Sequence, residues 1–220
     1  MNAIDVPMKI KINGEDGLMQ PEDGAKLGAV LDSLRVMMTE NQMAITGLIL
    51  DGSILTRDRE SVLLENPVTD YVCLELEVVQ KGLLARSVLG QVREHLPKIG
   101  ESLVETTTHF QTGRVEEGYS HLSGNLEALA LVQKCLINIL VLCESSREDQ
   151  VEKLEQLEVN TAAMSDFHEI LEQANAALKG QDLVALGDIL EYELGHILEQ
   201  WEQEVLKLDE LIDQLFPEDS

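Results

Sequence analysis

The chain has 220 residues, of which 44% are hydrophobic but only 3% aromatic, so its core must consist mainly of aliphatic side chains. Acidic residues number 41 and basic residues 16, which gives a formal net charge of −25. Such a charge repels nucleic-acid phosphates and anionic lipid headgroups, and no basic cluster offsets it. Binding to nucleic acid or to a membrane is therefore not expected.

The three cysteines, Cys73, Cys135 and Cys143, lie within apolar segments. Cys135 and Cys143 fall on one predicted helix, too far apart along it to form a disulfide. The N-terminus, MNAIDVPMKIKING, lacks the apolar stretch of a signal peptide. We therefore expect reduced thiols and a cytoplasmic location.

Residues 1–80 carry a pattern of strands around one helix. Met8, Ile10 and Ile12 alternate with polar residues and predict a strand, followed by a turn at residues 14–17. Apolar residues at helical spacing predict a helix over residues 26–43.

The second half of this region predicts a hairpin and a final strand. Asp51 and Gly52 separate two apolar runs, residues 45–50 and 53–56, and this dipeptide is a strong hairpin signal. A polar stretch continues through Pro67, and residues 71–79 then alternate as a last strand.

The segments MKIKINGEDG and PEDGAKLGAVLDSL resemble the ubiquitin-like superfamily, especially its small sulfur-carrier members. This resemblance implies a β-grasp domain over residues 1–80. Sulfur carriers act through a free C-terminal Gly-Gly, whereas here VVQKGL at residues 78–83 continues into a predicted helix. The resemblance therefore implies an adaptor module without carrier chemistry.

Residues 83–220 predict a second, helical domain with four long amphipathic segments. The first has an apolar face, and Pro97 with Gly100 predicts a kink or a split within it. Its apolar residues are Val88, Val92, Leu96, Ile99, Leu103 and Phe110.

The second segment, residues 126–143, is apolar around most of its circumference. Its strongly polar residues Glu127, Lys134 and Asn138 share one narrow stripe. We therefore expect this helix to be a central one, wrapped by the others. Its length and its polar residues argue against a membrane span.

The third segment starts near residues 145–148 and stops at Gly180, with an apolar face made of Leu154, Leu157, Met164, Phe167, Leu171, Ala174 and Leu178. The fourth covers residues 182–216 and carries one apolar seam. The seam consists of Leu190, Leu194, Ile197, Trp201, Val205, Leu208, Ile212 and Leu215. Short connections at Gly113 and Gly180 predict an antiparallel four-helix bundle, and the whole chain an α+β two-domain protein.

Two segments that each connect two predicted helices resemble the flagellin export chaperones, which are acidic helical bundles of the cytosol. These segments are THFQTGRVEEGYSHLSGNLEAL and ALKGQDLVALGDILEYEL. The resemblance covers about 100 residues of the helical region (residues 83–220). The opening motif of that family is absent, and the predicted β-grasp domain stands in its place. The resemblance implies a chaperone that holds part of a client protein.

No residue pattern predicts catalysis or a cofactor. Glu193 and His196 form an E-x-x-H, half of a di-iron motif, but no second E-x-x-H follows. The pairs Glu105 with His109, Glu117 with His121 and Asp166 with His168 have other spacings. We therefore predict no enzyme, no metal and no cofactor, with a bundle metalloprotein using Glu193 and His196 as an alternative.

Leu131 and Leu142 border the polar stripe. They lie outside the narrowest arc of the helix that could supply the core. Either other parts of the chain cover them, or a client protein or a second copy does. We predict a non-enzymatic adaptor or chaperone that holds an amphipathic client segment there. The alternative is a structural homo-oligomer that pairs along the seam at residues 197–215.

Overall fold

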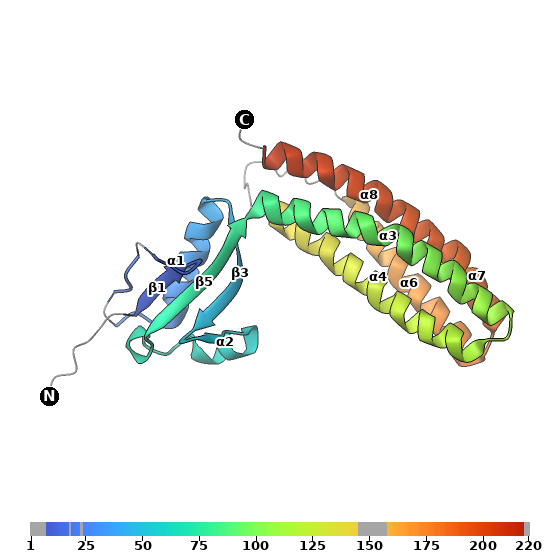
Figure 1. Cartoon of the computed structure of the whole chain (residues 1–220), viewed down its shortest axis with the longest axis horizontal. Helices are drawn as coiled ribbons and strands as arrows, with labels where there is room; N and C mark the ends of the chain where they lie inside the picture. The colour runs from blue at the N-terminus through green and yellow to red at the C-terminus, as the bar shows by residue number, and fades with distance from the viewer. Residues whose placement is uncertain (1–7, 18, 23, 145–157, 218–220) are drawn as a thin grey trace. The chain divides into compact units, whose positions relative to one another are not determined.

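The computed structural model describes residues 8–17, 19–22, 24–144 and 158–217. The chain divides into two compact units, residues 1–84 and 85–220. A five-stranded mixed sheet with helices forms the first unit, and helices form the second (Figure 1). The predicted α+β class is confirmed.

The sheet has the strand order β2-β1-β5-β3-β4. Its central pair, β1 and β5, is parallel, and the other neighbouring pairs are antiparallel. The strands are β1 Lys9–Ile12, β2 Glu15–Asp16, β3 Met43–Leu50, β4 Ser53–Ile54 and β5 Cys73–Gln80.

Both hairpin turns need two consecutive residues with positive φ, as type I′ turns do. Asp51 and Gly52, with φ of 49° and 76°, confirm the predicted hairpin between β3 and β4. The turn between β1 and β2 uses Asn13 and Gly14, with φ of 51° and 85°. It therefore lies earlier than the predicted turn at residues 14–17, because Asn13 also tolerates the left-handed conformation.

Helix α1, Leu27–Glu40, lies within the predicted helix and packs against one face of the sheet (Figure 1). A short helix α2, Arg57–Leu63, and the turn η1, Val68–Asp70, were not predicted. The hydroxyl of Thr56 caps α2, and the Arg35 guanidinium of α1 donates a 2.6 Å hydrogen bond to Glu60. This hydrogen bond raises the pKa of Arg35. The buried core of the unit consists of Met8, Ile10, Leu27, Val30, Leu31, Leu34, Leu50, Leu55, Val68, Leu74 and Leu76.

The helices of the second unit share one hydrophobic core. They are α3 Lys81–Gln111, α4 Val115–Glu144, α6 Glu158–Gly180, α7 Leu183–Asp188, the π-helical turn η4 Ile189–Glu193, and α8 Leu194–Leu215. Every residue of the predicted seam at positions 190–215 is buried, which confirms that prediction. Leu154 and Leu157 of the predicted third helix lie outside the described residues.

The predicted kink or split at Pro97 does not divide α3, which continues as one helix past this proline. A proline inside a helix loses one hydrogen bond and costs about 3 kcal/mol. The buried residues Val92, Leu96, Ile99 and Leu103 lie on both sides of Pro97, and their packing offsets that cost.

The turn between α6 and α7 differs from the predicted stop at Gly180. Gly180 still belongs to α6, and Gln181 adopts the left-handed conformation with φ of 55°. Two backbone hydrogen bonds, from Gln181 to Leu178 and from Asp182 to Ala177, close the turn as a Schellman motif. The Asp182 carboxylate then caps α7 by accepting from the Ala185 amide.

Helix α4 is not the wrapped central helix that its composition predicted. It buries one face, with Leu129, Val132, Leu136, Ile139 and Cys143, and leaves the opposite face exposed. The most deeply packed helix is α8, whose buried residues extend from its first turn to its last. Its edge-to-face contact between Trp201 and Phe167 of α6 has a centroid distance of 5.2 Å.

By length and composition, the stretch Val115–Cys143 is apolar enough to cross a membrane, with a mean hydropathy of 1.9 in an 18-residue window. The sequence argument that this helix is too short and too polar to span was therefore wrong. Core helices of soluble proteins meet the same criterion, and α4 supplies residues to the core of its unit.

Candidate functional site

One side of α4 carries apolar residues that are exposed, with no cover from the described residues of its unit. Leu131 is 62% exposed, Val141 56% and Ile137 39%. At about 100° per residue, these side chains and the polar residues Glu127, Lys134 and Asn138 share an arc of about 120°. We call these six residues the α4 face.

The two residues predicted to contact a partner differ in exposure. Leu131 is exposed and lies at one edge of the α4 face. Leu142 lies about three turns further along the helix at nearly the same angle around its axis, and it is half-buried. Ile137 and Val141 form the opposite edge, and the sequence analysis missed both because they lie on the far side of the polar stripe.

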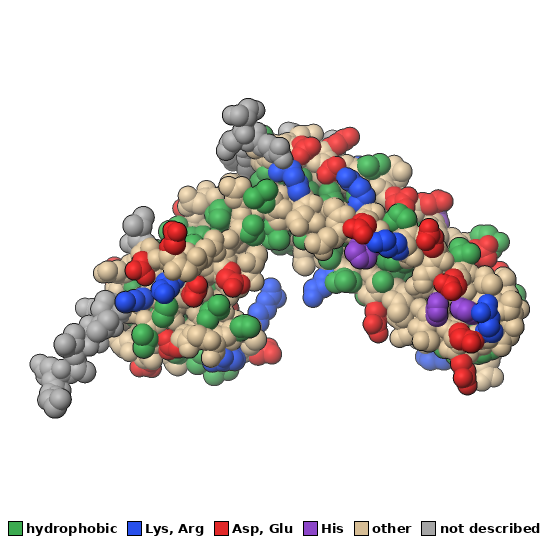
Figure 2. Space-filling view, viewed as in Figure 1, with side chains coloured by type: hydrophobic (Ala, Val, Ile, Leu, Met, Phe, Trp, Pro, Cys, Tyr) green, Lys and Arg blue, Asp and Glu red, His purple; other side chains and the backbone are tan. Residues whose placement is uncertain are grey.

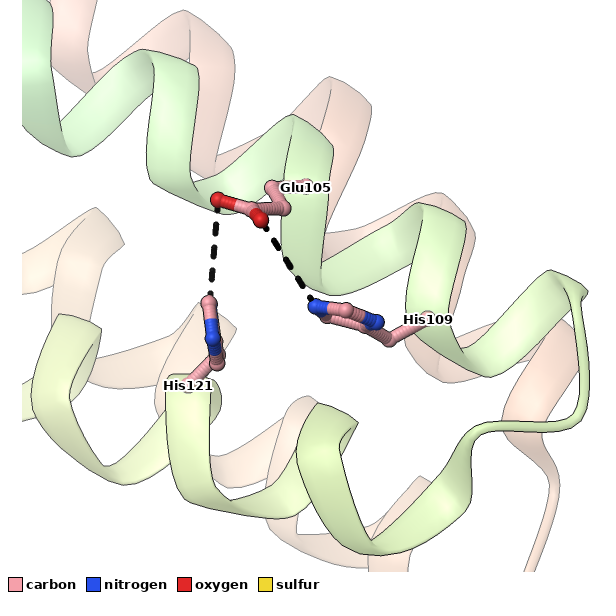
Figure 3. Close-up of side chains that lie close together, drawn as sticks. All are labelled: Glu105, His109 and His121. Atoms are coloured by element: carbon pink, nitrogen blue, oxygen red, sulfur yellow. Dashed lines mark ion pairs between the residues drawn. The ribbon is translucent and has the colours of Figure 1, made fainter.

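A second group of side chains meets between α3 and α4. Glu105 and His109 come from α3, and His121 comes from α4 (Figure 3). The Nε2 atom of His109 lies 3.8 Å from Oε1 of Glu105, and Nδ1 of His121 lies 3.9 Å from Oε2. The two imidazole rings meet edge to face with centroids 4.7 Å apart. We call these residues the Glu105 cluster.

The turn between α3 and α4 brings these residues together. Gly113, with φ of 76°, takes the left-handed position at the end of α3. Its amide donates to the Phe110 carbonyl, and the Arg114 amide donates to the His109 carbonyl, as in a Schellman motif. His109 is therefore fixed in the last turn of α3.

Close packing beside the cluster holds the two helices in place. The Phe110 ring lies against Gly118 of α4, where an added Cβ would come within 2.6 Å of a ring carbon. The same ring meets Tyr119 edge to face, with centroids 5.4 Å apart. Only glycine at position 118 allows this approach without displacing Phe110.

A buried hydrogen bond links the same two helices on the other side of the cluster. The Asn125 amide donates to the Thr106 hydroxyl at 2.9 Å, and this hydroxyl donates to the Ser102 carbonyl. Both side chains are almost fully buried. Thr106 follows Glu105 directly, and Asn125 lies one turn after His121, so this bond helps to fix the turns that carry Glu105 and His121.

Glu193 and His196, the pair considered only as an alternative to the prediction of no metal, lie on the surface. His196 has Glu199 at 3.8 Å and Gln200 at 3.1 Å. Within the described part of the chain, only the Glu105 cluster brings three residues of metal-binding type together. The sequence analysis set Glu105 and His109 aside for lacking the E-x-x-H spacing, although residues four apart share a helix face.

Cys73 and Cys135 form no disulfide and are half-buried, and Cys143 is buried. A cavity of about 230 Å³ lies in the first unit between α1 and the start of the sheet, lined by Ile10, Ile12, Gly17, Met19, Leu34, Met37, Met38 and Asn41. Its described lining residues are apolar apart from Asn41.

Two family models match the chain, one in each unit. Residues 8–80 match the TP0873 N-terminal domain. An uncharacterized protein of Treponema pallidum (strain Nichols) is 22% identical over 206 residues, which cover 92% of this chain and 98% of that protein. No solved structure matches the chain. Residues 87–204, more than half of the chain, match a domain of unknown function, and the protein therefore belongs to this family, DUF8042.

Proposed function

We propose that this protein is a non-enzymatic adaptor or chaperone that holds an amphipathic segment of a client protein on the α4 face. The observation that carries the proposal is the exposure of Leu131, Ile137 and Val141 on a helix whose other face is core. Apolar patches that a domain leaves uncovered commonly mark protein-binding sites.

In this proposal the first unit is a β-grasp domain. The strand order β2-β1-β5-β3-β4 with a parallel central pair supports it, and so does the packing of α1 on the sheet. The last strand, β5, continues directly into α3 and offers no free Gly-Gly end. The unit therefore acts as an adaptor module in this proposal, by analogy of fold.

The second unit is, in this proposal, an antiparallel four-helix bundle similar to the flagellin export chaperones. Two observations support the arrangement: α3 turns into α4 over residues 112–114, and α6 turns into α7 over residues 181–182. Turns this short place consecutive helices side by side in opposite directions.

The client is an amphipathic helix with basic polar residues. A helix laid on the α4 face would contact apolar side chains at both edges and the polar stripe between them. The chain carries a net charge of −25, and acidic side chains are spread over the visible face of the second unit, with apolar ones between them (Figure 2). This charge favours a basic partner and raises its rate of association.

Two alternatives to a client on the α4 face are less favoured: a membrane contact of this face, and pairing of two copies along α8. Anionic lipid headgroups would be repelled by the acidic chain, and Glu127 would enter the lipid with the apolar residues. The seam at residues 197–215 is buried in the unit's own core, so a second copy could pair there only by displacing other helices. The proposed location is the cytoplasm, where thiols such as those of Cys73 and Cys135 stay reduced.

The test is affinity capture from the native host, followed by binding of the recovered protein in purified form. We compare the natural chain with Leu131→Asp/Val141→Asp, and with Leu206→Asp as a matched control, because Leu206 is 52% exposed on α8. We expect the natural chain and the control to recover one partner that the double variant loses.

Three results would contradict the proposal. One is capture that the double variant leaves unchanged. Another is a homodimer, measured by light scattering, that the double variant dissociates. A third is binding to vesicles of anionic lipid that depends on Leu131 and Val141, because it would make the α4 face a membrane contact.

A further inference from the structure

The Glu105 cluster contains a buried imidazole whose nitrogens have no hydrogen-bond partner in the part of the chain that the structure describes. His109 is 6% exposed, and neither of its ring nitrogens has a hydrogen-bond partner among the described residues. Its Nε2 atom faces Glu105 at 3.8 Å, which is beyond hydrogen-bond distance (Figure 3). Buried polar groups are normally paired, so this nitrogen needs a partner that the described residues do not supply.

The cluster differs from the other histidine–carboxylate pairs of the chain. His168 lies 3.6 Å from Glu172, and His196 lies 3.8 Å from Glu199, but these side chains are between 67% and 80% exposed. Each is an ordinary surface pair on a single helix. The Glu105 cluster adds a second imidazole from another helix, and its carboxylate has one oxygen directed at each ring.

We propose that Glu105, His109 and His121 bind one divalent transition-metal ion, with Zn²⁺ as the ion that fits best. The ligand atoms all lie within 4.8 Å of one another, so an ion placed between them needs only a small contraction of the group. Zinc binds histidine nitrogen at about 2.0–2.1 Å and carboxylate oxygen at about 2.0–2.2 Å. The Glu105 side chain is 61% exposed and is free to swing toward the rings.

The donor set selects the class of ion. Two imidazole nitrogens and one carboxylate suit Zn²⁺, Fe²⁺, Co²⁺ and Ni²⁺, whereas Ca²⁺ and Mg²⁺ prefer oxygen ligands. Three protein ligands leave one position of a tetrahedral ion open for water or another small ligand. The half-exposed His121 and the exposed Glu105 leave a path from solvent to that position.

The site also joins two helices. His109 is fixed by the turn at Gly113, and His121 lies beyond Gly118, where Phe110 packs. A bound ion would therefore connect α3 to α4 near their shared turn. Because only the folded chain presents all three ligands, metal binding stabilises the folded state. This inference does not depend on the proposed client-binding function.

The test uses the full chain after removal of metal with a chelator, titrated with Zn²⁺ by calorimetry. We expect one ion per chain. His121→Gln and Glu105→Gln should each weaken binding by about 100-fold or more, since loss even of groups that support the ligands weakens binding by about 10–100-fold. His168→Gln is the matched control, because it removes a histidine of a Glu–His pair outside the cluster.

Two further readouts separate binding from folding. At 100 times the dissociation constant, Zn²⁺ should raise the Tm of the natural chain and of the control by about 5–10 °C, and the Tm of the two variants much less. Co²⁺ should give a visible absorption band that His121→Gln removes, while circular dichroism of the metal-free variant stays helical. Ca²⁺ should not bind.

The proposal is overturned by any of three results. The first is that the natural chain fails to bind Zn²⁺ or Co²⁺ in stoichiometric amounts. The second is that His121→Gln, shown by circular dichroism to be folded, binds Zn²⁺ as tightly as the natural chain. The third is that His168→Gln weakens binding as much as His121→Gln does, which would place the ion on surface histidines.

Discussion

Helices α4 and α8 differ in how composition relates to burial. Residues 126–143 of α4 have few polar residues, yet α4 buries one face and exposes Leu131, Ile137 and Val141 on the other. In contrast, α8 has many charged residues, but most of its apolar residues lie on one stripe, which is buried along the whole helix, and Leu206 is an exposed exception. The position of apolar residues around a helix therefore predicts burial better than their number does.

The difference between the two helices also separates stability from binding. The α8 stripe is fully used by the core, so changes there should alter the free energy of unfolding. The α4 face contributes little to the core, so changes there should alter contacts with other molecules. The following predictions test this division, from the largest expected effect to the smallest.

Replacing Trp201 by alanine should lower the free energy of unfolding by about 3–5 kcal/mol, because a large buried side chain leaves a cavity against Phe167. Chemical denaturation monitored by circular dichroism measures the change. Tyr192→Ala is the control, since Tyr192 is 65% exposed and its loss should change stability by less than about 0.5 kcal/mol. Equal effects of the two substitutions would contradict the assignment of α8 to the core.

Replacing Gly118 by alanine should destabilise the second unit by about 1–3 kcal/mol, because the new Cβ would meet the Phe110 ring. Thermal unfolding measures this effect. Gly124→Ala on the same helix meets no atom within 4 Å and should be neutral or stabilising, since alanine favours a helix by about 1 kcal/mol over glycine. If Gly118→Ala leaves the stability unchanged in thermal unfolding, the Phe110 ring is not closely packed against α4.

Replacing Glu204 by methionine should stabilise the unit by about 1 kcal/mol. Glu204 is 3% exposed on α8, and its Oε2 has no hydrogen-bond partner among the described residues. Its other oxygen accepts from Lys207, which is 54% exposed and keeps its hydration when the carboxylate is lost. Apolar residues often stabilise a core when they replace a buried ion pair. A loss of stability in denaturation would show that this carboxylate has a favourable role in the core.

Replacing Leu131 by aspartate should change the free energy of unfolding by less than about 0.5 kcal/mol, while abolishing client binding. Val132 is the neighbouring residue but is only 4% exposed. Val132→Asp should therefore unfold the unit, because a charge cannot be buried without a partner. If Leu131→Asp and Val132→Asp have similar free energies of unfolding, the contrast between an exposed Leu131 and a buried Val132 is contradicted.

Several elements could be predicted from the sequence because one local signal determines each of them. The seam of α8 follows from helical spacing, and the β3–β4 hairpin follows from Asp51 and Gly52. Helix α2 was missed because it buries no residue and depends on a cap at Thr56 and on the contact between Arg35 and Glu60.

The central role assigned to α4 was wrong because composition alone cannot show which faces of a helix have neighbours. The Glu105 cluster was missed for a related reason. The spacing of Glu105 and His109 indicates a shared face, but the approach of His121 depends on the exact turn at Gly113 and on the fit of Phe110 against Gly118. The client-binding surface stays a prediction for Leu131, and Ile137 and Val141 replace Leu142 as its other exposed residues.

The turn η4, Ile189–Glu193, is π-helical, so each of its turns contains more residues than a turn of the α-helices on either side. Such a turn, with its i to i+5 hydrogen bonds, accommodates one residue more than a turn of regular α-helix. Losing a residue there would return the segment to regular geometry, whereas losing one within α8 would rotate every later side chain by about 100°. Length changes among relatives of this chain should therefore be tolerated at η4 and be eliminated by selection within α8.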